Sequence, residues 1–143
     1  MEHLAIMKKS WGFTQKILSG EKKIESRWYK TTYPPWNKIR KGEFVYFKNS
    51  GEPVSLKAEV DRIIQFSSLT PEKVKHILDR YGKEDGINRR RVPEFFELFK
   101  DKKYCILVFL KNPEEIEPFE INKGGFGLMA SWITVNNITE IKI

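Results

Sequence analysis

The architecture of this protein can be reasoned out from one stretch near its start, residues 20–30, GEKKIESRWYK. From Lys23 to Lys30 the side chains alternate with a period of two, which is typical of a strand. One predicted face holds Ile24, Ser26 and Trp28, and the opposite face holds Lys23, Glu25, Arg27 and Tyr29. We therefore expect Glu25 and Arg27 to share a face. The plainest alternative is a solvated strand whose charges keep the protein dispersed.

The residues before this strand predict a strand and a helix. Residues 3–8, HLAIMK, are typical of a short strand, and Ser10 is a candidate N-cap for a helix that runs through Leu18. Gly20 fits the left-handed cap that ends many helices. The expected order is thus a strand, a helix of about ten residues, and then the strand of the opening stretch.

Short strands and tight turns are expected next. Residues 31–43 contain two consecutive prolines and predict a loop, because proline cannot take part in a regular ladder. Strands are expected at residues 44–48 and 54–66, with residues 49–53 as the hairpin that connects them. This alternation of strands and turns is typical of a small barrel.

The second half of the chain predicts two inserted helices and further strands. Thr70 is a candidate N-cap with Pro71 at the first helical position, and apolar residues follow at helical spacing up to Tyr81. A polar connector is expected over 82–91, followed by a short helix opened by Pro93. A buried strand over 104–110, an irregular excursion over 115–127 and one or two closing strands over 131–143 are expected after it. This order predicts one α+β domain, residues 1–143, around a twisted antiparallel sheet that can close on itself.

Charge and cysteine content indicate the class of partner and the compartment. The net charge of +7 favours acidic partners such as nucleic acid. Residues 1–66 hold 13 Lys and Arg against 7 Asp and Glu, whereas residues 67–143 hold 13 against 12. No stretch approaches the ~18–20 apolar residues needed to span a bilayer, so a cytoplasmic protein without a membrane partner is expected. Cys105 lies in an apolar run and is expected to be buried.

Signatures of metal and cofactor sites are missing from the sequence. One cysteine and two isolated histidines, His3 and His76, do not make a zinc site of the usual spacing, and we expect both histidines on the surface or on a helix. Residues 123–127, KGGFG, lack the lysine and hydroxyl pair of a phosphate-binding loop, so a flexible turn is expected there. The sequence therefore predicts no cofactor and no metal.

Four positions of the opening stretch form a known pattern. Gly20, Lys22, Glu25 and Arg27 follow the motif G-x-K-x-x-E-x-R, immediately after the predicted helix and at the entry to the predicted strand. On this motif and its setting, the sequence resembles the ASCH domain family, a branch of the PUA-like superfamily. The motif alone is moderately specific, and its position between helix and strand makes the resemblance stronger.

Two further segments carry the same resemblance, residues 41–47, KGEFVYF, and residues 58–60, AEV. The resemblance covers residues 3–66 in detail and the remainder by general arrangement. It implies a small PUA-like β-barrel of about five or six mostly antiparallel strands with flanking helices, and a basic cleft between the first helix and the barrel. Because related PUA, YTH and EVE domains bind RNA or modified bases, the resemblance implies RNA or a nucleotide as the partner.

The motif residues are the first candidates for that cleft. Lys22 lies in the turn between helix and strand, where its ammonium would pair with a phosphate; the plain alternative is an exposed lysine. Glu25 and Arg27 can hold each other, and a guanidinium fixed along one edge still offers donors to a phosphate or a base, although a purely structural ion pair has equal weight. Trp28 is expected in the core on the opposite face, which leaves Tyr29 to stack on a base.

Residues outside the motif complete the predicted binding set. Four of them, Lys8, Lys9, Ser10 and Trp11, lie where the first strand meets the helix and are expected near the same cleft. The other candidates are Lys48, Arg89, Arg90, Arg91 and Trp132. A run of three arginines is more often a solvated loop than a ligand site, but such runs also contact phosphates. The plain alternative for the tryptophan is a place in the core.

Two other functions stay open. Some ASCH proteins resemble amidohydrolases of acylated cytidine that use a lysine, a threonine and a glutamate, and others resemble ribonucleases; an enzyme of either kind would use Lys22, Glu25 and Glu59 here. Glu25 stands where that threonine is expected, which replaces a hydroxyl by a carboxylate and changes both charge and nucleophilicity. The third function is a protein-docking module whose basic face meets an acidic partner.

Overall fold

The computed structural model describes residues 1–127 and 129–143. Its strands are β1 (Glu2–Met7), β2 (Ile24–Tyr29), β3 (Phe44–Asn49), β4 (Val54–Phe66), β5 (Tyr104–Phe119) and β6 (Trp132–Val135). Its helices are α1 (Phe13–Ser19), α2 (Pro71–Tyr81) and α3 (Val92–Phe99), with 3₁₀ turns η1 (Lys9–Trp11), η2 (Arg89–Arg91) and η3 (Ile138–Glu140).

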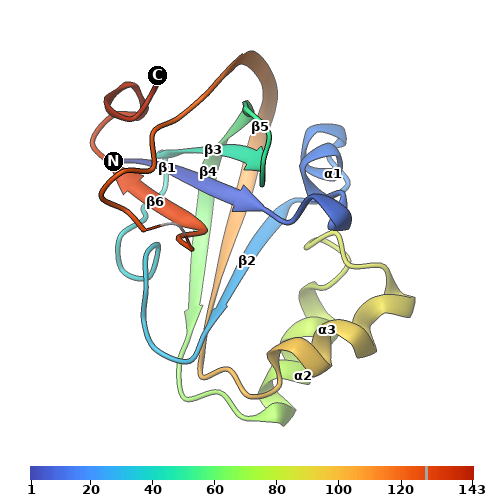
Figure 1. The fold of residues 1–143 in the computed structure, drawn as a ribbon. Helices are drawn as coiled ribbons and strands as arrows, with labels where there is room; N and C mark the ends of the chain where they lie inside the picture. Colours follow the sequence, from blue (N-terminus) through green and yellow to red (C-terminus); the bar gives the residue numbers. More distant parts are fainter. Residues whose placement is uncertain (128) are drawn as a thin grey trace.

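The six strands of the described chain form one sheet in the order β2-β5-β4-β3-β1-β6. Neighbouring strands are antiparallel except for β1 and β3, which run parallel. The sheet curls into a half-barrel, so that β1 and β6 lie in front of β4 and β5 in the view of Figure 1. The predicted α+β fold, a small PUA-like barrel of mostly antiparallel strands with flanking helices, is confirmed.

The predicted strand over 54–66 is confirmed to its ends, but the excursion predicted over 115–127 is partly wrong. Strand β5 continues to Phe119, because its second half pairs with the first half of β4, where Leu56 is opposite Glu115 and Val54 is opposite Phe119. Bulges between the two strands shift the register and accommodate the prolines. The first half of β5 is buried, as predicted, and includes Cys105.

The start of the first helix also differs from the prediction. Ser10 lies inside η1 and does not cap a helix, because Gly12, at φ 68°, turns the chain in the left-handed conformation between η1 and α1. Helix α1 is therefore shorter than expected. Gly20 ends it at φ 85° with its N–H donating to the carbonyl of Ile17, which confirms the predicted cap.

Helices α2 and α3 pack together at one end of the half-barrel, and the connector between them rises toward α1 (Figure 1). Thr70 caps α2 as predicted, since its side chain accepts from the N–H of Lys73. In α3, Phe95 is fully buried, and Phe99 stacks flat on Trp28 of β2 at 4.7 Å between ring centroids. Trp28 thus lies in the core, as predicted. Among the described residues, every helix is too short or too polar to cross a membrane.

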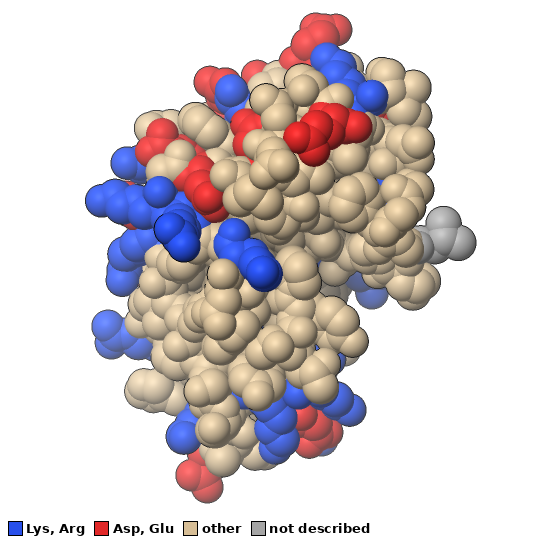
Figure 2. All heavy atoms as spheres, turned by 90° about the vertical axis from the view of Figure 1, so that its left-hand side faces the viewer, with Lys and Arg blue, Asp and Glu red and all other residues tan. Residues whose placement is uncertain are grey.

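Figure 2 shows the face that lies on the left of Figure 1. Much of this face is covered by side chains other than Lys, Arg, Asp and Glu, while lysines and arginines gather mainly from the left margin toward the centre and at the lower end. The positive excess of the sequence therefore does not form one continuous basic surface on this side of the molecule.

Candidate functional site

The ammonium group of Lys22 is enclosed by protein. The side chain is 1% exposed, and Nζ donates to the carbonyl of Asp85 at 2.6 Å and to its Oδ1 at 2.5 Å. Oε1 of Glu25 lies 3.2 Å from the same nitrogen, and the ring of Phe13 lies below it. The sequence suggested that Lys22 projects from the turn toward a ligand. The structure shows instead that its side chain is buried. Its charge is balanced inside the protein, so it holds the site together rather than facing a ligand.

The connector between α2 and α3 closes over Lys22. The carbonyl of Glu84 accepts hydrogen bonds from the N–H groups of Lys23 and Ile24, which fastens the connector to β2. Gly86 follows at φ 78°, and a Cβ atom there would lie 3.0 Å from Cβ of Lys22. Only glycine combines this backbone conformation with so close a contact.

Asp85 is a site residue that the sequence reasoning missed. Its Oδ2 accepts a hydrogen bond from the hydroxyl of Ser26 at 2.5 Å, and the indole N–H of Trp28 donates to that hydroxyl at 3.0 Å. Burial raises the pKa of the Asp85 carboxyl, and the nearby Glu25 acts in the same direction, against the opposing effect of Lys22. The Asp-Gly pair in a polar connector was the available signal, but sequence alone does not say which strand such a turn covers.

Glu25 and Arg27 share a face and form the predicted ion pair, with Nη2 of Arg27 2.8 Å from Oε2 of Glu25. The guanidinium also donates to the carbonyl and the hydroxyl of Ser131, both at 3.1 Å, and to the carbonyl of Ile6 at 3.4 Å. Its side chain is 12% exposed and lies over the ring of Trp132. Arg27 therefore ties the edge strand β2 to β1 and to the entry of β6, across the open side of the half-barrel.

A pocket of about 270 Å³ opens beside this network, between the end of β1, strand β2 and helix α3. Its aromatic walls are Trp11, Phe13, Trp28, Tyr29, Phe95 and Phe99. Its polar walls are Lys8, Glu25, Ser26, Arg27, Asp85 and Ser131. The pocket is smaller than the ~300–1,000 Å³ typical of drug-sized ligands, so its size suits a single base or nucleoside.

Four of the predicted binding residues meet in this pocket, namely Trp11, Glu25, Arg27 and Tyr29. Tyr29 is half-buried, and its hydroxyl donates to the carbonyl of Pro34 at 3.0 Å. Burial raises the pKa of Tyr29 to about 12, so the phenol stays neutral and can donate. Lys8, which the sequence placed near the cleft together with Lys9, Ser10 and Trp11, lines the pocket as well, and so does Ser131, the neighbour of Trp132.

Other predicted residues lie elsewhere. Two of them form ion pairs on the surface, Lys9 with Glu52 and Arg91 with Glu94. Ser10 and Arg90 are exposed, and Lys48 is on β3. Glu59, the acid proposed for an enzyme, pairs with Lys111 on β5 and does not line the pocket. Arg89 lines a second, larger groove on the other side of the connector.

His3 is buried, so the prediction of a surface or helix histidine is wrong for this residue. Its Nε2 lies 2.8 Å from Oε1 of Glu43, and its Nδ1 lies 3.1 Å from the hydroxyl of Thr134 and 3.2 Å from the indole nitrogen of Trp132. A carboxylate only accepts and an indole only donates, so Nε2 carries the proton and Nδ1 is the acceptor. Trp132 thereby belongs to the core beside β1. Burial lowers the pKa of His3.

Metal ligands are not clustered in the described part of the chain, where no group of three or more His, Cys, Asp or Glu side chains is arranged to hold an ion. Cys105 is buried and burial raises the pKa of its thiol, which disfavours the reactive thiolate.

Comparison with known proteins identifies the fold. No family model and no curated protein match the sequence. Among solved structures, the chain is similar to ASCH from Zymomonas mobilis, with a TM-score of 0.68, 16% identity and coverage of 99% of this chain and 96% of that chain. A hypothetical protein, PH0355, matches with a TM-score of 0.53, 20% identity and coverage of 81% of this chain and 100% of that chain. The ASCH fold that the motif implied is therefore the fold of this chain.

Proposed function

We propose, on the premise of this ASCH fold, that residues 1–143 act as one RNA-binding domain that holds a single base in the 270 Å³ pocket. The observation that carries the proposal is the meeting of the Trp11, Trp28 and Tyr29 rings with the fixed guanidinium of Arg27 in one small cavity. An aromatic wall with a few placed polar groups is the usual composition of a site for a flat heterocycle.

The rings provide the affinity. Stacking of a base on an aromatic side chain is worth about 1–3 kcal/mol, whichever base it is. Trp11 is only partly buried and is held edge-on by Phe95, with 5.0 Å between ring centroids, so its free surface is available to a ligand. Lys8 is exposed and lies over the same ring, where its charge can meet a phosphate.

The backbone of β2 provides hydrogen bonds for the base edge. This strand is at the edge of the sheet, and the N–H of Ile24 points away from β5 toward the carbonyl of Glu84, at 2.9 Å. In an antiparallel pair the backbone groups of every second residue point the same way, so those of Ser26 and Trp28 are also directed away from β5. Both residues line the pocket, and their donors and acceptors can read a base.

Titration with single-stranded RNA tests the proposal. Binding is expected to quench tryptophan fluorescence, because two tryptophans line the pocket, and to weaken steeply as salt rises, since neutralised phosphates release counterions. Absence of salt-sensitive binding to single-stranded RNA or tRNA would remove the proposal.

A matched pair of variants locates the binding. Trp11→Leu is expected to weaken RNA binding about tenfold or more, which corresponds to the loss of one stacked base. Trp36→Leu is the control, because Trp36 is also partly buried and packs edge-on against a ring, that of Tyr104, but does not line the pocket. Equal losses in the two variants would place the binding elsewhere.

A hydrolase of a nucleoside or of RNA is the second candidate, and one observation favours it. Ser26 and Asp85 both line the pocket, and a carboxylate that accepts a hydrogen bond from a hydroxyl is the arrangement of a base beside a nucleophile. In such a hydrolase the catalytic carboxylate would be Asp85 and not Glu59. Incubation of the protein with acetylated cytidine and with RNA tests it, with Ser26→Ala as the inactive variant and Ser55→Ala as its control. No turnover by the unsubstituted protein would exclude it.

A further inference from the structure

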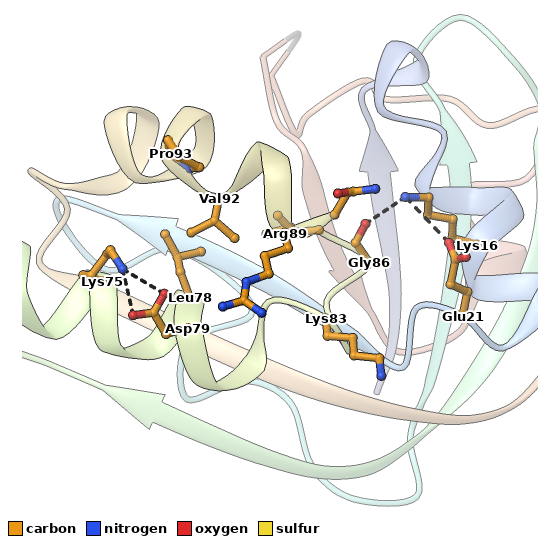
Figure 3. A pocket seen from close by; sticks show the side chains of 12 residues that line it. Lys16, Glu21, Lys75, Leu78, Asp79, Lys83, Gly86, Arg89, Val92 and Pro93 are labelled. Atoms are coloured by element: carbon orange, nitrogen blue, oxygen red, sulfur yellow. Dashed lines mark hydrogen bonds and ion pairs between the residues drawn. The ribbon is translucent and has the colours of Figure 1, made fainter.

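A second groove, of about 960 Å³, lies on the opposite side of the connector from the base pocket. It is bordered by α1, by the last turns of α2, and by the connector as it leads into η2 and α3 (Figure 3). Its charged side chains are Lys16, Glu21, Lys75, Asp79, Lys83 and Arg89. Four cations against two carboxylates make it a positive groove.

Both carboxylates of the groove already have basic partners. Asp79 is bonded by Lys75 at 2.8 Å, and Glu21 lies 3.6 Å from Lys16, which also donates to the carbonyl of Gly86 at 2.9 Å. Figure 3 shows these contacts as dashed lines. The groove therefore has no carboxylate left over to neutralise its remaining cations.

Lys83 and Arg89 are those remaining cations. Both are exposed, and within residues 1–127 and 129–143 neither takes part in an ion pair or a side-chain hydrogen bond with another residue. Both side chains line the groove, and Figure 3 shows that Arg89 is directed toward Leu78 and Asp79 of α2, whereas Lys83 points away from them. Two unpartnered cations that face one cavity suit a polyanion with regularly spaced charges.

The groove and the base pocket share a wall. Asp85 lines the pocket, Gly86 and Asn88 line the groove, and Ile87 lines both, so one short turn of the connector separates the two cavities. A strand with a base in the pocket needs only to cross this short, buried segment to bring its neighbouring phosphates between Lys83 and Arg89.

We infer that this groove binds the phosphate backbone of the same single-stranded RNA whose base occupies the pocket, with Lys83 and Arg89 as the phosphate contacts. The inference rests on the proposed function and extends it, because it assigns the helical insertion over residues 67–102 a role in guiding the strand. The apolar floor, which includes Leu78 and Val92, can contact the riboses.

The double variant Lys83→Ala/Arg89→Ala tests the inference. It is titrated with a labelled single-stranded RNA of about ten nucleotides and with a mononucleoside, across a series of salt concentrations. Each phosphate contact contributes about 0.7 to the slope of log K against log salt for a single strand, so the slope should become shallower by about 1.4. Binding of the nucleoside should stay the same, because the nucleoside lacks a phosphate.

The control is Lys38→Ala/Arg40→Ala, which removes one lysine and one arginine from an exposed loop away from both cavities. Its slope should stay close to that of the unsubstituted protein. An unchanged slope in Lys83→Ala/Arg89→Ala, or the same change in the control, would reject phosphate binding in the groove. The proposal that the pocket binds a base would be unaffected. Loss of all RNA binding by the unsubstituted protein would instead reject the proposed function.

Discussion

The ammonium of Lys22 lies 2.5 Å from the carboxylate of Asp85, a residue 63 positions further along the chain. This contact joins the motif at the end of α1 to the helical insertion between β4 and β5. Both partners are buried, and Glu25 and Ser26 complete the group. The motif lysine therefore fixes the position of the connector, and the connector in turn separates the base pocket from the groove.

Removal of Lys22 is expected to destabilise the fold strongly. Lys22→Met leaves the buried Asp85 carboxylate without its cation, while Glu25 keeps Arg27, and breaking a buried pair in this way costs about 3–5 kcal/mol. The measurement is the free energy of unfolding in urea. Lys23→Met is the matched control, because Lys23 is exposed and a surface substitution changes stability by about 0.5 kcal/mol or less. Similar values for both variants would contradict the structure at this position.

A methyl group at Gly86 should show how closely the connector approaches Lys22. Gly86→Ala and Gly51→Ala both force alanine into a left-handed conformation, at φ 78° and 81°, which costs about 1–2 kcal/mol. Only the first also places Cβ against the Lys22 side chain, since nothing lies within 4 Å of a Cβ at Gly51. We expect Gly86→Ala to be the less stable of the two by a further ~1–3 kcal/mol. Equal midpoints of thermal unfolding for the two variants would show that the connector can move away from Lys22 at little energetic cost.

Arg27→Lys should loosen the junction between β2 and β6 without removing the charge. A lysine ammonium cannot replace the planar guanidinium of Arg27, which donates hydrogen bonds to Glu25 and Ser131 at the same time. The N–H of Ile6, which donates to the same Ser131 carbonyl at 2.9 Å, is expected to exchange with solvent at least about tenfold faster, since hydrogen bonds to charged groups contribute about 1.5–3 kcal/mol. Amide hydrogen exchange measures this directly.

Arg62→Lys is the comparison for that experiment. Arg62 is exposed on β4 and lies over the ring of Phe109, but among the described residues it makes no hydrogen bond to the junction. If this control accelerates exchange at Ile6 as much as Arg27→Lys does, the junction does not depend on the guanidinium of Arg27.

Acidification should destabilise the protein through His3. The pKa of His3 is lowered in the folded state. As the pH falls below about 6.5, His3 therefore binds a proton in the unfolded chain while it stays neutral in the folded protein. Stability is therefore expected to decrease from pH 7 toward pH 5, by at most ~1.4 kcal/mol per pH unit for this one group. Urea unfolding at several pH values provides the slope.

His3→Gln should flatten this pH dependence, although it also weakens the protein at neutral pH. His76→Gln should keep the slope, because His76 is exposed on α2. Asp85, whose pKa is raised by burial, contributes with the opposite sign but is present in all three proteins, so it does not affect the comparison. A slope retained in His3→Gln would assign the acid sensitivity to other groups.

Local patterns in the sequence predicted much of the fold because they depend on neighbouring residues. The alternation in β2, the Thr70 cap and the Gly20 cap all follow from the side chains within a few positions. The second half of β5 was missed for the converse reason. Its prolines and glutamates are typical of a loop, and only pairing with β4 makes a strand of them.

The pocket was predictable where the candidate residues lie on one strand or, like Trp11, just before the first helix. Glu25, Arg27 and Tyr29 could be grouped from their spacing, and they do line the same cavity. Asp85 and Ser131 lie far from them in sequence and reach the cavity through the connector and the entry to β6. The burial of Lys22 depends on the same connector. Single-sequence reasoning contains no information about such long-range contacts.

The position of β1 between β3 and β6 sets an order for synthesis on the ribosome. β1 is synthesised before β6, one of its two partners, which ends only at Val135. Until β6 arrives, one edge of β1 is open, His3 lacks Trp132, and Arg27 lacks Ser131. The segments of the helices and of the long β4–β5 hairpin are therefore all synthesised before Ser131 can supply its wall of the pocket.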